Sequence, residues 1–367
     1  MAIYRIFPQK DTSLFSESPT ENTGIDEILE LGGYEDSSGV GRAIRSIVQF
    51  STTEIQDVVN NKSSGASVSA SLNLYLAEAS NVNTTYTVYA YPTSKGWENG
   101  TGKLGDLPKN TAGASWLYPS GGLTGSWVES LPAGVTSSYI SGQTGGGSWY
   151  TGSSGTNLES STTFNLYDNQ DISIDVSNAV DLFYSSSLNN NGFLLKLDDS
   201  IEFNTSSSMR LRYFSTDTNT IYSPFLEFKW DDFSYDTGSL SVLSTDESFI
   251  SIKNNKGIYN NSGKIRFRLN AKPKYPTRTF TTSSVYLTNY ALPTASYWGL
   301  KDEDTGEAFV EFSNYTKISC DSTGPYFDIF LDGIEPERYY RILVKTTLAD
   351  STLVFDDKNI FKVERNG

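Results

Sequence analysis

Histidine is absent from the 367 residues of this chain. Histidine is the side chain that titrates near neutral pH, and it is the commonest protein ligand of metal ions. Its absence excludes a histidine general base and a metal site built on imidazole. We therefore expect a chain that is not an enzyme, and we look first for surfaces that bind or assemble.

Cysteine is nearly as scarce, because Cys320 is the only one in the sequence. A single cysteine excludes an intrachain disulfide, and no histidine is present to activate its thiol as a nucleophile. The stretch Thr316–Cys320 has the pattern of a strand. We therefore expect the thiol to pack as a small apolar group.

Long apolar runs are also missing. No stretch approaches the roughly twenty apolar residues of a membrane span, and the opening MAIYRIFPQK lacks the apolar run of a signal peptide. The sequence predicts no membrane insertion and a protein that is made and folded in a cytoplasm.

Basic residues are outnumbered, with 28 Lys and Arg against 43 Asp and Glu and a formal net charge of −15. A negative field of this size repels phosphate backbones and keeps a concentrated protein in solution. Nucleic acid is therefore excluded as an expected partner.

Aromatic residues are plentiful, with 23 Tyr, 20 Phe and 6 Trp, and they favour β structure. Only two short helices are expected, Glu54–Val59 and Ala179–Tyr184, the second capped by Ser177 or Asn178. Short runs in which apolar and polar residues alternate predict strands of a sandwich or jelly roll. In the first part of the chain these runs are Ala70–Leu76, Tyr86–Tyr91, Phe193–Leu197, Met209–Phe214 and Phe225–Trp230.

The length suits two all-β domains that each bury a core. We place the boundary at the turn-like YDTGS, so that residues 1–238 form an N-terminal jelly-roll β-sandwich and residues 239–367 an immunoglobulin-like β-sandwich. In the second domain, Tyr339 and Tyr340 follow the turn GIEPER and are candidates for a tyrosine corner. Its predicted strands are Gly263–Asn270, Ala308–Phe312, Tyr326–Leu331, Tyr339–Thr347 and Ile360–Val363.

Residues 96–155 are rich in glycine and punctuated by tryptophan, which predicts long ordered loops in the first domain. Two interpretations stay open. The aromatic residues either pack as pins that hold the loops down, or stack on sugar rings at the surface. The candidate sugar-binding residues are Trp97, Trp116, Trp127, Trp149 and Tyr150.

Other motifs for chemistry are weak. The string GWENGTGKLGD lacks the glycine spacing, the Ser or Thr and the following helix of a phosphate-binding loop. Neighbouring carboxylates such as Asp198-Asp199 and Asp231-Asp232 lie on opposite sides of a strand or in turns, so they do not predict a catalytic pair. No cofactor is expected; calcium, held by oxygen atoms in a loop such as Asp11–Glu30, is the one metal that we leave open.

Several long strings carry a resemblance to known families. From Asp11 to Asp232 the chain resembles the carbohydrate-module-like jelly-roll domains of the DNRLRE type, through DTSLFSESPTENTG with IDEILELGG, RSIVQF, SLNLYLAEAS, SKGWENGTG, DISIDVSNAVDLFY and NGFLLKLDDS. The second half, with YPTRTFTTSSVYLTNYALPTASYWGLKDEDTGE, YTKISCDSTGPYFDIFLDGIEPERYY and FDDKNIFKV, is similar to virion structural proteins of contractile-tailed marine cyanophages and related phages.

The resemblance implies a non-enzymatic virion component of the tail, baseplate or neck, or a decoration protein. Its expected partners are other virion proteins and further copies of itself, and it would be assembled in the host cytoplasm. The alternative is an adhesin that contacts a host-surface glycan through the tryptophan-rich loops.

Overall fold

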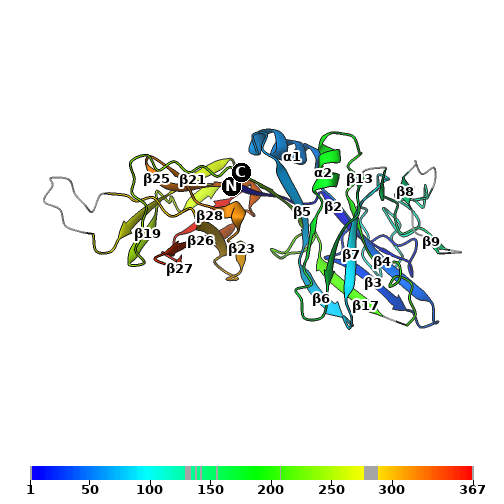
Figure 1. Ribbon diagram of the computed structural model, residues 1–367. Helices are drawn as coiled ribbons and strands as arrows, with labels where there is room; N and C mark the ends of the chain where they lie inside the picture. Colours follow the sequence, from blue (N-terminus) through cyan, green and yellow to red (C-terminus); the bar gives the residue numbers. More distant parts are fainter. Residues whose placement is uncertain are drawn as a thin grey trace. The chain divides into compact units, whose positions relative to one another are not determined.

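The computed structural model describes residues 2–128, 134–136, 139–140, 143–153, 156–206, 208–276 and 288–365. It is mostly β, with several antiparallel sheets and two short α-helices in the described ranges (Figure 1). Within the predicted loop region 96–155, residues 129–133, 137–138, 141–142 and 154–155 lie outside the described residues. No helix in the described ranges combines the length and the hydropathy that a membrane crossing requires.

The chain folds into two compact units. The N-terminal unit comprises Ile6–Lys62 and Ser69–Phe228, and the C-terminal unit comprises the chain from Lys229 onward with the first residues up to Arg5 and the short segment Ser63–Val68. The division after Phe228 falls ten residues before the expected boundary after residue 238. The physical reason is that Trp230 already packs on Phe330, with 5.5 Å between ring centroids.

The N-terminal unit is built on one large antiparallel sheet with the order β14-β7-β16-β4-β3-β17-β6, in which β2 also pairs with β4. A smaller sheet places β18, β5 and β15 side by side. The strands of the two sheets are β2 (Lys10–Phe15), β3 (Ile28–Glu35), β4 (Gly41–Gln49), β5 (Val68–Leu74), β6 (Leu76–Ser80), β7 (Tyr86–Pro92), β14 (Ser160–Phe164), β15 (Ile172–Asp175), β16 (Phe193–Leu197), β17 (Met209–Phe214) and β18 (Phe225–Trp230).

The loops between β7 and β14 contain only two-residue strands where they are described. Three pairs form, β8 with β11, β9 with β10 and β12 with β13. Their bounds are β8 (Val135–Thr136), β9 (Tyr139–Ile140), β10 (Gln143–Thr144), β11 (Trp149–Tyr150), β12 (Gly152–Ser153) and β13 (Thr156–Asn157). These loops lie on the large sheet, which explains why every residue of β16 is buried: Leu194 packs under the loops, and Phe193 packs on Phe183 from the opposite face.

Both expected helices are present with shifted ends. Helix α1 (Thr52–Asp57) begins earlier than predicted because the Ser51 hydroxyl caps it by accepting from the Glu54 amide, and it continues as a π-helical turn, η1 (Val58–Lys62). Helix α2 (Ser177–Tyr184) starts after Val176, which provides no side-chain cap. Ser177 and Asn178 are therefore inside α2 rather than at its N-cap.

The C-terminal unit has two sheets, β19-β21-β25-β24 and β20-β28-β26-β22-β23, and β27 also pairs with β26. All pairings are antiparallel except β20 with β28. The bounds are β19 (Ser248–Lys253), β20 (Ile258–Asn260), β21 (Lys264–Pro273), β22 (Ser296–Asp302), β23 (Ala308–Val310), β24 (Ser319–Asp321), β25 (Gly324–Phe330), β26 (Arg338–Leu348), β27 (Ser351–Phe355) and β28 (Ile360–Glu364), with 3-10 turns at Asn314–Thr316 and Leu331–Gly333.

Aromatic rings fill the core of the C-terminal unit. Trp298 stacks on Phe327 with 5.2 Å between centroids, and Phe361 packs on Tyr340 at 5.7 Å. The Tyr340 hydroxyl donates to the backbone carbonyl of Glu335 at 2.8 Å, which is the hydrogen bond of a tyrosine corner. Cys320 is buried as expected, and burial raises the pKa of its thiol to about 11.

Candidate functional site

The tryptophan-rich loops form a packed layer on the large sheet of the N-terminal unit. Trp97, Trp116, Trp127 and Trp149 are each 0 to 4% exposed and share one apolar cluster with residues of β2, β4 and β16. The indole N–H of Trp97 donates to the carbonyl of Asn191, and that of Trp127 donates to the carbonyl of Ser115, both at 2.9 Å. Tyr150 is only partly buried.

The packed positions determine what these side chains can do chemically. A sugar ring stacks on an aromatic face that solvent can reach, and the four indole rings present no such face in this structure. The four indole rings lie at positions expected of side chains that pack to hold the loops on the sheet. Among the five predicted residues, only the Tyr150 side chain remains partly accessible.

Asn22 is the polar centre of the loop layer, and sequence reasoning did not identify it. It is completely buried, and its amide nitrogen donates to the carbonyls of Asn99 and Ala114, both at 2.8 Å. Its amide oxygen accepts from the backbone N–H groups of Gly102 and Gly24. An asparagine with both donors and its acceptor engaged fixes three separate backbone segments at once.

Glycine is needed where these segments meet. Gly100 has a φ of +81°, and a Cβ atom there would lie 2.0 Å from the carbonyl oxygen of Ala112. Within the GWENGTGKLGD string, close backbone approach therefore accounts for Gly100 and Gly102. The Gly102 amide binds the Asn22 side chain instead of a phosphate.

A buried ion pair joins the loop layer to the sheet below it. Arg45 on β4 is fully buried and binds the two carboxylate oxygens of Glu202 at 3.0 and 2.6 Å. Its third contact is the carbonyl of Gly146 at 2.8 Å, and its guanidinium carbon lies 5.1 Å from the ring centroids of both Trp116 and Trp149. This bidentate, sandwiched geometry is one that arginine supplies and lysine does not.

Three acidic side chains that stand next to another carboxylate in the sequence have structural partners. Asp302 pairs with Arg338 at 2.7 Å, Glu303 forms a bidentate pair with Arg341, and Asp199 pairs with Lys196. Burial raises the pKa of Asp302, but the hydrogen bonds from Arg338 and Thr305 together outweigh it and the pKa is lowered. The hydrogen bonds from Arg341 lower the pKa of Glu303.

The Asp11–Glu30 segment does not gather carboxylates around a common point. Asp11 accepts from the Thr216 amide and hydroxyl, and Glu21 accepts from the Gly105 amide. Over the described ranges, no group of three or more Cys, Asp or Glu side chains is arranged to hold a metal ion.

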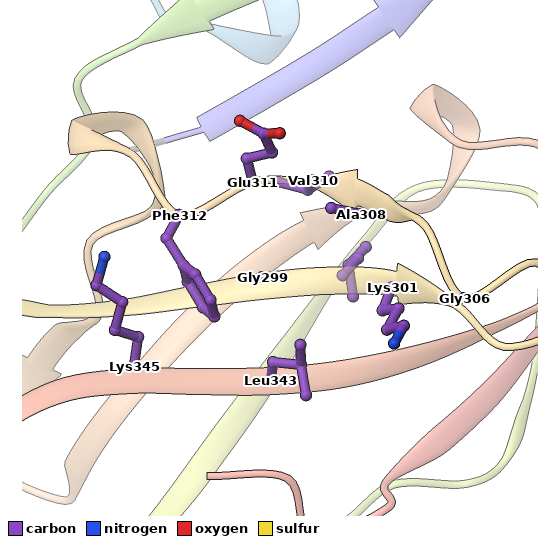
Figure 2. Close-up of a pocket in the computed structure, with 10 residues that line it drawn as sticks. Gly299, Lys301, Gly306, Ala308, Val310, Glu311, Phe312, Leu343 and Lys345 are labelled. Carbon is purple, nitrogen blue, oxygen red and sulfur yellow. The ribbon is translucent and has the colours of Figure 1, made fainter. Parts of the chain in front are cut away.

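The outer face of the C-terminal unit carries an open groove of about 420 Å³, a size typical of ligand pockets. Leu343 lies at its floor and the Phe312 ring at one side, where Gly299 leaves room because a Cβ there would lie 3.0 Å from that ring. Figure 2 shows Lys345 beside Phe312 and Lys301 toward Gly306. No sequence motif pointed to this groove, since its residues come from three strands, the turn between β22 and β23 and the segment after β23.

Comparisons with known proteins give little similarity. No protein-family model and no curated protein sequence matches the chain. A DUF4785 family protein from Legionella pneumophila is 10% identical with a TM-score of 0.18, and the match covers 97% of this chain and 65% of that one, slightly less than two thirds. The botulinum neurotoxin DC binding domain, solved in complex with rat synaptotagmin II, is 10% identical with a TM-score of 0.19, over 96% of this chain and 72% of that one. TM-scores this low support no conclusion about fold or function.

Proposed function

We propose that this chain is a non-enzymatic structural protein of a bacteriophage particle, a component of the tail, baseplate or neck or a decoration protein, that works through protein–protein assembly. In this proposal the N-terminal unit is a jelly-roll sandwich of the DNRLRE type and the C-terminal unit an immunoglobulin-like sandwich. The protein would be made and assembled in the host cytoplasm, with other virion proteins and further copies of itself as partners.

The observation that carries the proposal is the construction of the loop layer. The four tryptophans are in the core, Asn22 has its hydrogen-bonding groups engaged, and Arg45 is held by Glu202 and Gly146. The described parts of these loops, which are segments of the kind that usually carries function, are thus tied to the sheet. A preorganised surface loses little conformational entropy on association, which suits a subunit that must make the same contacts in every copy.

The engagement of the acidic residues supports the same proposal. Asp302, Glu303 and Asp199 serve as ion-pair partners. A catalytic acid and base would need separated pKa values and a shared cleft. The sandwich-like β structure and the aromatic cores suit a subunit with large stable interfaces.

The test is the protein content of purified phage particles. Density-gradient-purified particles should contain the chain at a constant ratio to the major capsid protein, measured by quantitative mass spectrometry. Its absence from infectious particles, with the chain present in the infected cell, would show that it is not a virion component.

A further inference from the structure

The groove on the C-terminal unit carries two lysines that form no ion pair at contact distance with a described residue, although Lys301 is near enough to Glu303 to help lower the pKa of that carboxyl. In the part of the chain that the structure describes, neither Lys301 nor Lys345 forms an ion pair, although the chain has an excess of acidic residues. The Lys345 ammonium lies 5.4 Å from the Phe312 ring centroid and 5.7 Å from that of Tyr297. Glu311 also lines the groove, and its carboxylate points away from the floor (Figure 2).

The composition of the groove defines the chemistry of its occupant. Leu343 and Phe312 offer an apolar floor and wall, and the lysines offer a positive charge toward each end. A ligand that fits has an apolar side chain next to a carboxylate. An acidic peptide turn with an exposed aromatic residue has this composition.

The turn between β14 and β15 in the N-terminal unit has the same composition. Tyr167 is 94% exposed and Leu166 is 59% exposed, and they are adjacent in sequence. Asp168 follows them, and the segment 165–171 (NLYDNQD) contains no basic residue. Two neighbouring exposed apolar side chains beside an acid form a patch of the kind found at protein interfaces.

The turn is held rigidly in shape. The Asp168 amide donates to the Asn165 carbonyl at 3.2 Å, and the Asn165 amide donates back to the Asp168 carboxylate at 2.9 Å. The Gln170 side chain donates to the carbonyls of Asn165, Leu166 and Asp168. These bonds fix the backbone while leaving Leu166 and Tyr167 pointing into solvent, so the turn is ordered before it binds anything.

We propose that the Leu166–Tyr167–Asp168 turn of one copy inserts into the groove of a second copy, with the aromatic ring on Leu343 and Phe312 and the carboxylate between Lys301 and Lys345. Two other strongly exposed apolar residues in the described ranges fit less well, because lysines lie nearby in the sequence: Lys103 and Lys109 near Leu107, and Lys272 and Lys274 near Tyr275. The inference rests on the proposed function and names one of its assembly contacts.

The contact is heterologous, because the turn and the groove are different surfaces. Made once between two subunits, such a contact leaves a free groove on one and a free turn on the other, and subunits add into rings or chains. Made reciprocally, it closes a two-fold dimer. It is therefore a contact suited to a repeated position in a particle.

Two variants separate the surfaces. The groove variant is Lys301→Glu with Lys345→Glu, and the turn variant is Leu166→Ser with Tyr167→Ser. Sedimentation velocity of the full chain should show reversible association of the wild type below about 100 μM, which added NaCl weakens because salt screens the lysine–carboxylate contact. Each variant alone should associate at least about tenfold more weakly.

The decisive sample is an equimolar mixture of the two variants. The groove variant keeps an intact turn and the turn variant keeps an intact groove, so the mixture should form a one-to-one complex and nothing larger. This complex also shows that both variants are folded. Matched controls are Lys256→Glu with Lys274→Glu and, separately, Leu107→Ser, which change exposed residues outside the groove and the turn and should associate like the wild type.

A wild type that stays monomeric at about 100 μM, the upper end for weak specific contacts, overturns the inference. A mixture that forms no complex also overturns it, as does association that both variants leave unchanged. None of these results bears on whether the chain is present in phage particles, so a failure here is distinguishable from a failure of the proposed function.

Discussion

At the scale of single residues, the N-terminal unit depends on polar groups that are buried in fixed pairs. Arg45 and Glu202 are 157 positions apart in sequence and meet in a bidentate ion pair below the loop layer. Lys196 adds a second positive charge 3.6 Å from the Glu202 carboxylate. Removing Arg45 leaves the buried Glu202 carboxylate without its bidentate partner and with Lys196 as the nearest positive charge.

Arg45→Met should therefore lower the free energy of unfolding by about 3 to 5 kcal/mol, measured by urea denaturation at neutral pH. The double variant Arg45→Met with Glu202→Gln should recover part of this loss, because it also removes the negative charge of the buried carboxylate that has lost its arginine partner. If the loss in the double variant equals the sum of the losses measured for Arg45→Met alone and Glu202→Gln alone, the pair does not act as a coupled unit.

Asp11 gives a prediction about pH. It is 2% exposed, and burial raises its pKa from 3.8 to about 7 against the opposing hydrogen bonds from Thr216. Between pH 3.8 and about 7 the folded state retains a proton that the unfolded chain has lost. The Asp11 contribution therefore becomes more destabilising as pH rises through this range, by up to about 1.4 kcal/mol per pH unit.

Asp11→Asn keeps an oxygen acceptor for Thr216 and cannot ionise. The stability of this variant relative to the wild type should increase from pH 4 to pH 7 in urea unfolding of the N-terminal unit. A relative stability that is constant over this range would mean that Asp11 does not titrate there in the folded state.

At the scale of elements, the loop layer is an extension of the core. Trp127 is fully buried, and Trp127→Ala should lower the free energy of unfolding by about 3 to 5 kcal/mol, as for other buried large aromatic residues. Tyr150→Ala changes a partly exposed residue of the same loops and should lower the free energy of unfolding clearly less. Thermal and urea unfolding of both variants measure the difference.

A Trp97→Ala variant that loses sugar binding while its melting temperature is unchanged would favour the adhesin alternative.

The tyrosine corner of the C-terminal unit allows a test with a built-in control. Tyr340→Phe leaves the Glu335 carbonyl without its hydroxyl donor and should lower the free energy of unfolding by about 1 to 3 kcal/mol. Tyr339→Phe changes a residue that is 47% exposed on the opposite face of β26 and should have almost no effect. Equal losses in the two variants would show that the corner bond does not stabilise the unit.

Strands could be predicted where the pattern of apolar and polar residues within the strand itself indicates it. Met209–Phe214 and Phe225–Trp230 match β17 and β18 residue for residue. In β17 the alternating pattern reflects burial on one face, whereas β18 is buried at every position except Lys229. The two consecutive residues Tyr339 and Tyr340 suggested a tyrosine corner, but only the register of β26 decides which of the two rings faces the core. Asn22 and the Arg45–Glu202 pair gave no signal, because their partners are brought together by the fold and not by spacing in the sequence.

At the scale of the whole molecule, an acidic chain folds into two compact, mostly β units. The net charge of −15 keeps copies apart at long range, so contacts between them need local complementarity such as the two lysines of the groove. In a symmetric particle a weak contact of this kind is repeated many times, and the repetition supplies the stability.

The most direct test of the central claim is the position of the chain on intact phage particles, by cryo-electron microscopy supported by gold-labelled antibodies to each unit. We predict density that fits both units at symmetry-related sites of the tail, baseplate, neck or head surface. Particles with no density and no label for either unit, from a preparation in which the antibodies recognise the purified chain, would contradict the account.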